Sequence, residues 1–160
     1  MKQTDRGCSV VQDDRRAMRR RLLKACSLGA LTCSLPGFAH EYYARQFMLI
    51  HPWTDPTTPG QANAHVHFRL ESIVGADRLL AARFAFCRSV ELRPGLDDAL
   101  PALAGVDIAP GERMDFVPDG VHVMLKELTQ PLLADRSYPL ELVFEISGTL
   151  VVMMSMAGSD

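Results

Sequence analysis

Downstream of residue 39, the chain is a succession of short apolar runs separated by turns rich in proline and glycine. The runs are shorter than most helices, and several alternate apolar with polar side chains, as half-buried strands do. No downstream segment has the length and the apolar stripe of an amphipathic helix. We therefore predict an all-β domain, either a β-sandwich or a barrel. Residues 40–160 number 121, which is enough for one domain with one core.

The turn residues set the boundaries of the predicted strands. Pro52 is expected to end the first strand, and Ser147-Gly148 to form the turn of a final hairpin. The third and fourth runs adjoin, so they are either two strands or one strand with a bulge. The predicted strands are Tyr43–His51, His65–Ile73, Leu79–Phe86, Cys87–Leu92, Val106–Ile108, Met114–Val117, Val121–Leu128, Tyr138–Ile146 and Thr149–Met156.

The first 39 residues are typical of an export signal with a basic n-region. Six basic residues between positions 15 and 24 precede the apolar stretch Ala25–Phe38, and Ala39 closes a small-x-small cleavage pattern. The apolar stretch is too short to span a bilayer stably, so we expect no permanent membrane span. Arg19 and Arg20 also resemble the pair of a twin-arginine signal, which leaves both that route and the Sec route open. We predict a periplasmic protein.

Cleavage after Ala39 would release a strongly acidic domain. It would keep nine basic and sixteen acidic side chains, for a formal charge of −7. This charge disfavours nucleic acid and anionic membranes as partners and is compatible with metal ions. Of the four cysteines only Cys87 would remain, which excludes an internal disulfide. Cys26 and Cys33 lack the apolar and small residues that precede a lipidated cysteine, so lipidation is the lesser alternative.

A His-x-Met pair, His122 and Met124, follows a Pro-Asp-Gly turn inside one predicted strand. Because strand side chains alternate between faces, the imidazole and the thioether project from the same face. This combination suits a soft monovalent copper ion better than calcium or magnesium. The alternative is an ordinary strand with one hydrogen-bonded histidine and one core methionine.

Three further histidines are candidate donors to the same ion. His65 and His67 share one face of a predicted strand, and His40 would become the new amino terminus after cleavage. A free α-amino group beside an imidazole chelates copper strongly. The alternative is that these imidazoles are simply solvated.

The chain carries no motif of an enzyme. A nucleophile elbow, a phosphate-binding loop and a zinc-protease motif are all absent from the sequence. We predict that the protein is not an enzyme.

A series of short motifs, in this order, resembles the periplasmic copper chaperone family PCu(A)C. The motifs are His40-Glu41-Tyr42, Ile50-His51-Pro52-Trp53-Thr54, Pro59-Gly60, Val90-Glu91-Leu92, Gly105-Val106-Asp107-Ile108-Ala109-Pro110-Gly111, Pro118-Asp119-Gly120-Val121-His122-Val123-Met124-Leu125, Gln130-Pro131-Leu132 and Pro139-Leu140-Glu141-Leu142-Val143-Phe144-Glu145. The resemblance implies a cupredoxin-like β-sandwich of Greek-key type over residues 40–160. It also implies a carrier that holds Cu(I) and hands it to the copper centre of cytochrome oxidase during assembly.

The same resemblance implies a copper site of four side chains, of which only His122 and Met124 are present here. Arg93 stands where the family has a histidine, and Leu100 stands where it has a methionine. Arginine stays protonated and cannot coordinate a metal, and leucine has no donor atom. We therefore expect copper binding weaker than that of a complete site.

Three interpretations follow from this incomplete set. In the first, the domain binds copper through a rebuilt site that recruits His65, His67 or His40. In the second, copper binding has been lost, and the fold remains as an interaction module for an assembly partner. In the third, the domain is an unrelated exported β-sandwich.

Overall fold

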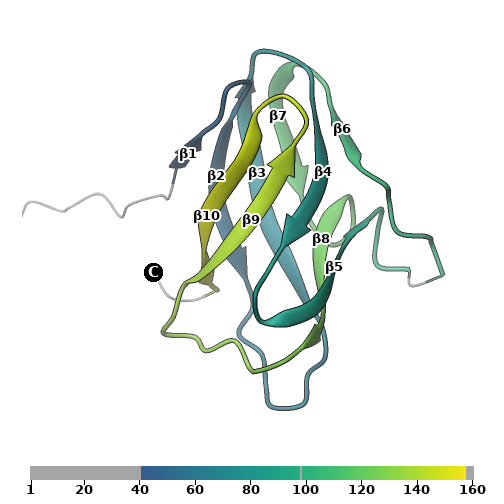
Figure 1. The fold of residues 1–160 in the computed structure, drawn as a ribbon, viewed down its shortest axis with the longest axis vertical. Helices are drawn as coiled ribbons and strands as arrows, with labels where there is room; N and C mark the ends of the chain where they lie inside the picture. Colours follow the sequence, from purple (N-terminus) through teal and green to yellow (C-terminus); the bar gives the residue numbers. More distant parts are fainter. Residues whose placement is uncertain (1–40, 98, 158–160) are drawn as a thin grey trace, which may run out of the picture. The chain divides into compact units, whose positions relative to one another are not determined.

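The computed structural model describes residues 41–97 and 99–157. These residues form ten strands and no helix, which confirms the predicted all-β class (Figure 1). The prediction of one first strand over Tyr43–His51 is wrong, because residues 44–47 interrupt it and leave two strands. The expected signal peptide and His40 lie outside the described residues. The strands are β1 (Glu41–Tyr43), β2 (Met48–Thr54), β3 (Ala64–Ile73), β4 (Asp77–Arg83), β5 (Cys87–Arg93), β6 (Val106–Ile108), β7 (Gly111–Phe116), β8 (His122–Leu128), β9 (Tyr138–Phe144) and β10 (Gly148–Met156).

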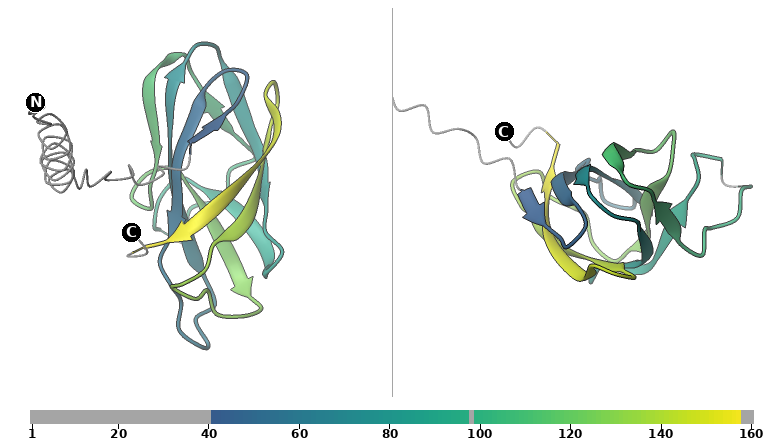
Figure 2. Two further views of the ribbon diagram at one scale, coloured as in Figure 1. Left: turned by 90° about the vertical axis from the view of Figure 1, so that its left-hand side faces the viewer. Right: turned by 90° about the horizontal axis from the view of Figure 1, so that it is seen from above.

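The strands pair in the order β5-β8-β3-β2-β10-β9-β4-β6, with β1 added beside β2 and β7 beside β3. All pairs are antiparallel except β10 with β2. The strand β10 joins the two halves of this sandwich: residues 148–154 pair with β9, and Ser155 and Met156 pair with the end of β2. Viewed from above, the strands surround a common core (Figure 2).

Strand alternation builds the core. On β3 every second residue from Ala64 to Leu70 is buried, including Val66 and Phe68. Leu142 and Met154, from β9 and β10, are fully buried in the same cluster. Burial of one such side chain contributes about 1.5–3 kcal/mol before conformational entropy is subtracted. The alternate side chains from His65 to Glu71 are half-buried on the outer face of the sheet, where the candidate site lies.

The prediction that Pro52 ends the first strand is wrong. The strand β2 continues to Thr54, and its pairing with β3 shifts register between Ile50 and Trp53. His51 has a φ of 53° at this irregularity. Because the ladder is already interrupted there, the missing N–H of proline costs little. The extension places Trp53 opposite His67 of β3.

The adjoining runs after Gly75 are two strands that belong to different halves of the sandwich. The strand β4 pairs with β9 and β6, whereas β5 pairs with β8. At the crossing, Phe84 and Phe86 pack edge-on against Tyr138, with ring centroids 6.1 and 5.6 Å away. The chain thus passes from one half of the sandwich to the other, which brings β5 beside β8, the strand that carries His122 and Met124.

Candidate metal centre

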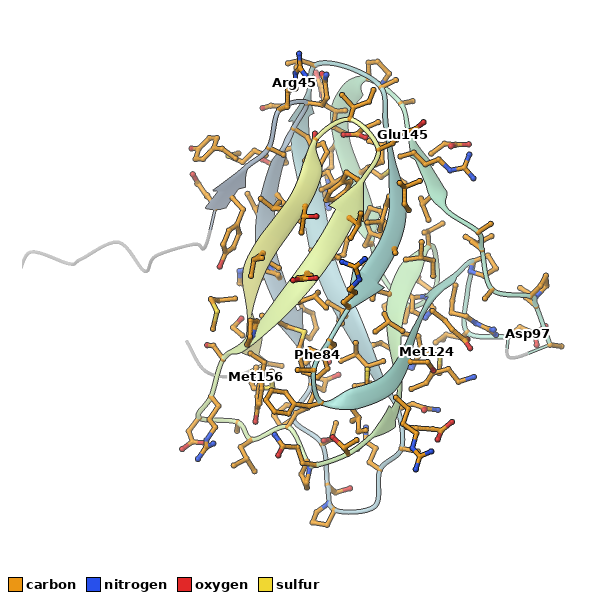
Figure 3. All side chains as sticks on the ribbon, in the orientation of Figure 1. Arg45, Phe84, Asp97, Met124, Glu145 and Met156 are labelled. Atoms are coloured by element: carbon orange, nitrogen blue, oxygen red, sulfur yellow. The ribbon has the colours of Figure 1, made fainter. Side chains whose placement is uncertain are left out.

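The His-x-Met pair lies on one face of β8, as the spacing predicts. Val123 and Leu125 belong to the hydrophobic core, so His122 and Met124 lie on the other side of the sheet. Figure 3 labels Met124 on this strand. Both side chains are nevertheless buried, with 0% of His122 and 6% of Met124 exposed.

Cross-strand register determines the neighbours of the pair. Met124 lies opposite His65 of β3 on one side and opposite Glu91 of β5 on the other. His122 lies opposite Arg93 at the end of β5. Directly opposed residues in antiparallel strands have Cβ atoms about 4.5–5.5 Å apart, so these side chains are in contact range.

The imidazoles of His65 and His122 form the centre of the candidate site. Their ring centroids are 5.0 Å apart, with the planes inclined by 57°. Nδ1 of His122 lies 3.1 Å from the carbonyl oxygen of Gly120, which can only accept a hydrogen bond. In the neutral imidazole the proton is therefore on Nδ1, and Nε2 carries the free lone pair. A backbone carbonyl that fixes the tautomer in this way is typical of a metal-ligating histidine.

Two nitrogen atoms in this pair are buried without a hydrogen-bond partner: Nε2 of His122 and Nδ1 of His65. Buried polar atoms are almost always hydrogen-bonded, so two such nitrogens in neighbouring rings require an explanation. A shared metal ion would provide one, because it would accept a lone pair from each ring. The thioether of Met124 adds a third donor on the same face.

The electrostatic surroundings keep His122 neutral. Burial lowers the pKa of His122, the Gly120 carbonyl opposes this, and the nearby His65 and Arg93 lower the pKa further. A neutral imidazole is the form that binds a metal. His122 can therefore act as a ligand at neutral pH without first losing a proton.

Arg93, the last residue of β5, forms an ion pair with Glu91, and this pair is largely buried. Its side chain is buried, with Nη1 3.5 Å from Oε2 of Glu91 and Nη2 donating to the Asp97 carbonyl oxygen at 3.0 Å. Lys126 is paired with the same Glu91 carboxylate at 3.2 Å. Arg93 and Lys126 thus share the Glu91 carboxylate beside the candidate site.

His65 and His67, two of the further candidate donors, have different surroundings in the structure. His65 lies beside His122, and the hydroxyl of the fully buried Thr54 donates to the His65 carbonyl oxygen at 2.7 Å. His67 instead stacks on Trp53, with ring centroids 3.9 Å apart and planes within 6° of parallel. Leu100 is 41% exposed in the loop after β5. His40 lies outside the described residues.

Sequence reasoning did not find one contributor to this centre, Thr54, which fixes the strand that carries His65. The pairing of Arg93 with Glu91, by contrast, agrees with the alternation along β5, which places both residues on one face. The contact of Thr54 depends on the extension of β2 beyond Pro52, which the sequence pattern argues against.

Within residues 41–97 and 99–157, no group of three or more His, Cys, Asp and Glu side chains is placed to hold a metal ion. The candidate centre has two imidazoles and depends on a thioether for its third donor. Such a set disfavours hard cations and favours a soft monovalent ion.

The fold defines a class, the compact β-sandwich domains of PCuAC type. The chain belongs to the LpqE-like family, whose family model matches residues 47–156 and whose description names a lipoprotein. This membership excludes the interpretation as an unrelated β-sandwich. No curated protein matches the chain.

Solved PCuAC domains share the fold. The apo domain from PmoF1 superposes with a TM-score of 0.65 at 25% identity, over 73% of this chain and 98% of that one. The copper-bound domain from PmoF2 gives 0.63 at 24% identity, over 73% and 97%. The Cu(I)-bound DR1885 protein of Deinococcus radiodurans gives 0.56 at 18% identity, over 76% and 82%.

In the described part of the chain, no helix is long and apolar enough to cross a membrane. Cys26 and Cys33, the cysteines considered for lipidation, lie outside that part.

Proposed function

We propose that this domain is a periplasmic carrier of Cu(I), with the ion as its cargo, bound by His122, Met124 and His65. The observation that supports this most directly is the pair of buried, unpartnered imidazole nitrogens in rings 5.0 Å apart. The copper-bound state of two solved relatives with this fold supports the choice of metal.

The chemistry of the three donors suits a carrier. A thioether has no proton to lose and forms no disulfide, so it remains a donor in an oxidising compartment. The neutral imidazole of His122 likewise needs no deprotonation, because burial lowers its pKa. Such donors release copper by ligand exchange. We propose the copper centre of cytochrome oxidase as the acceptor.

The affinity for copper should be lower than that of a site with four donors. The centre has three donors, and the guanidinium of Arg93 lies opposite His122. A buried positive charge close to a bound cation weakens binding, because the low-dielectric surroundings screen it poorly. We expect a one-to-one complex that a strong Cu(I) chelator can unload.

Competition with a colorimetric Cu(I) chelator tests the proposal on the full chain after export. The wild-type domain should take up one equivalent of Cu(I), and His122→Ala should abolish this binding. His51→Ala is the matched control, since it removes an exposed imidazole from the same sheet. A tight one-to-one complex that survives His122→Ala would show that this ligand assignment is wrong.

A second candidate function is an interaction module that no longer binds metal. The observation that favours it is the buried Arg93 side chain, whose charge occupies the surroundings of His122. The same titration separates the two functions, because only a carrier competes with the chelator for copper. A wild-type domain that takes up no copper would favour the interaction module.

A further inference from the structure

The three donors of the proposed copper site are closed off from the outside. His122 is fully buried, Met124 is 6% exposed, and neither Nε2 of His122 nor Nδ1 of His65 has accessible surface. Ligand exchange requires an incoming donor to reach the ion before the last resident donor leaves. An acceptor protein therefore needs a more accessible group that receives copper from this centre.

His67 occupies the position next to this centre on the side that faces solvent. It lies two residues after His65 on the same face of β3, about 6.6 Å along the strand. The pairing of β3 with β8 is described as far as Val66 and Val123, and one further step of that register brings His67 level with His122. At that point β3 leaves β8 and pairs with β7 instead.

His67 also borders an open groove of about 550 Å³ on the outer face of the sheet. The groove includes Trp53 and His51 but none of the three proposed copper donors. It therefore begins where the buried centre ends, and His67 is adjacent to both.

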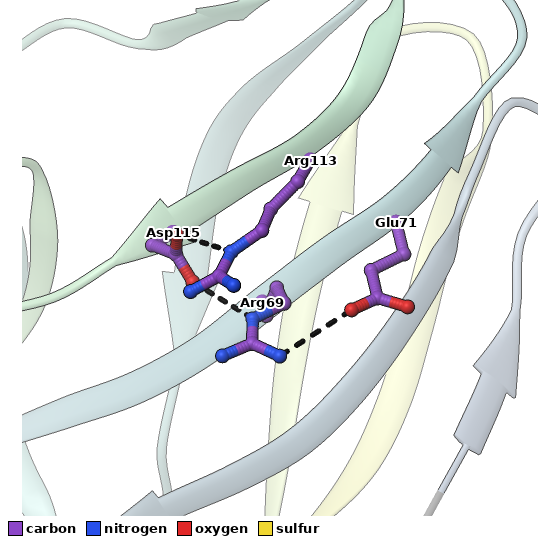
Figure 4. Close-up of polar contacts among 4 residues, drawn as sticks. All are labelled: Arg69, Glu71, Arg113 and Asp115. Atoms are coloured by element: carbon purple, nitrogen blue, oxygen red, sulfur yellow. Dashed lines mark hydrogen bonds and ion pairs between the residues drawn. The ribbon is translucent and has the colours of Figure 1, made fainter.

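The wall of the groove on the β3 and β7 side is held by ion pairs (Figure 4). Asp115 accepts from Arg113 at 2.6 Å and from Arg69 at 2.9 Å, and Arg69 also reaches Glu71 at 3.3 Å. The charged groups of this wall are paired with one another. Because these charged side chains are paired with one another, the imidazole of His67 is the group on this side of the groove that can bind a soft metal ion. His51 also lines the groove.

We propose, on the basis of the proposed copper function, that His67 is the exchange ligand through which Cu(I) passes between the buried centre and the groove. In the resting state its ring is held against Trp53. Rotation of the ring away from Trp53 directs it toward His122. The stack thus holds the ring in a retracted position from which it can turn toward the ion.

The step balances without any redox partner. A Cu–N bond to the neutral imidazole of His67 forms, and then a bond from copper to His65 or Met124 breaks. Copper remains Cu(I) throughout, and no proton moves, because a neutral imidazole binds through a lone pair that it already carries. A donor from the acceptor then displaces His67 from the groove side.

An intermediate of this kind alters rates and leaves the equilibrium unchanged. Removing it should slow loading and release by the same factor, because both directions pass through the same state. We expect His67→Gln to slow Cu(I) transfer to and from the chelator at least tenfold, while the dissociation constant stays within threefold of wild type. Arg83→Gln, at an exposed position of β4 outside the groove, is the control and should leave both rates unchanged.

Four outcomes of this experiment are informative. Equal slowing in both directions at constant affinity supports the exchange role. Unchanged rates overturn it and leave the copper site intact. A weaker affinity with faster release overturns it as well, because His67 would then be a resident ligand or a structural support. Absence of copper binding in the wild-type domain would overturn the proposed function together with this inference.

A second measurement uses the unmodified protein and so does not depend on the variant folding. Trp53 is the chain's single tryptophan, and it stacks on His67. Movement of the ring during loading should change its fluorescence transiently in a stopped-flow experiment, before the final level is reached. Copper loading with no transient phase would contradict passage through His67.

Discussion

At the scale of single residues, burial and a neighbouring positive charge act in the same direction on His122. His122 is fully buried, and the cationic Arg93 lies opposite it on the neighbouring strand. Both effects favour the neutral imidazole, and burial has the larger effect. Both features favour the form of His122 that binds a metal. The charge of Arg93 also weakens copper binding, and the burial of His122 makes the stability of the domain depend on pH.

We predict that Arg93→Gln tightens Cu(I) binding. Charges a few ångströms apart interact by roughly 1–4 kcal/mol in partly buried surroundings, so removal of one should tighten binding by about tenfold or more. The variant leaves Glu91 paired with Lys126 at 3.2 Å. The same substitution should raise the pKa of His122, measurable by NMR titration of its ring.

Arg88→Gln provides the control for Arg93→Gln. Arg88 lies on the same strand, but its side chain is 77% exposed and pairs with Glu127. It should leave the affinity unchanged. A weaker complex after Arg93→Gln would mean that the arginine supports the site and does not repel the ion.

Stability of the metal-free domain should fall as the pH drops below about 6.5, the ordinary pKa of histidine. The pKa values of His122 and His67 are lowered in the folded state, first of all by burial. Between that value and the lowered pKa, the unfolded chain binds protons that the folded domain does not, which favours unfolding. Above pH 6.5 both states are neutral and the effect vanishes.

Urea unfolding at a series of pH values measures this dependence. His122→Gln should flatten the stability profile between pH 6.5 and 5, because the protonation of that ring no longer distinguishes the two states. A profile as steep as that of wild type would exclude His122 as a contributor.

At the scale of elements, Asp77 connects the start of β4 to the turn between β9 and β10. Its carboxylate accepts the backbone N–H groups of Arg78, Ile146 and Ser147 at 2.7, 2.9 and 3.0 Å. Burial raises the pKa of Asp77, and the donors on Ser147, Ile146 and Arg78 more than offset this and lower it. One side chain therefore fixes the turn of the final hairpin against a strand that is distant in sequence.

We predict that Asp77→Asn lowers the free energy of unfolding by about 2–3 kcal/mol, since hydrogen bonds to a charged acceptor contribute about 1.5–3 kcal/mol each and the amide cannot satisfy all three donors. Urea denaturation near neutral pH measures the loss. In the wild type this contribution should be present above pH 3.8 and disappear as the pH falls through the lowered pKa of Asp77. Asp135→Asn, at an exposed loop position, should change stability by less than about 0.5 kcal/mol.

At the scale of the whole molecule, the two halves of the sandwich are joined through the end of β10. Residues up to Met154 pair with β9, and the last two pair in parallel with Trp53 and Thr54 of β2. Thr54 in turn holds the His65 carbonyl, so the join also supports the candidate centre. Met156, at this point, is 2% exposed and belongs to the core.

We predict that Met156→Ala costs about 2–5 kcal/mol, the usual range for removal of a buried methionine side chain. Met153→Ala, on the same strand but 39% exposed, should cost less than about 1 kcal/mol. Thermal unfolding of both variants tests this, and a single transition is expected for each because the two halves share one core. A similar cost for both residues would contradict a role of Met156 in closing the sandwich.

Much of the local structure could be predicted from the sequence. The alternation from residue 65 to 73 predicts β3 within one residue, and Ser147-Gly148 marks the final hairpin. The projection of His122 and Met124 from one face also follows from their spacing alone. The strand end at Pro52 was predicted wrongly, because a bulge that removes the penalty on proline leaves no clear signal in the sequence.

The sequence by itself determined the strand pattern, the family and the pairing of an imidazole with a thioether on one face. Alternation is a property of the extended backbone, so it needs no partner strand. Only the tertiary structure decided that His65 lies beside His122 while His67 stacks on Trp53, and that Arg93 is buried opposite His122. Those relations depend on the register between strands distant in sequence, which is set by packing across the whole sandwich.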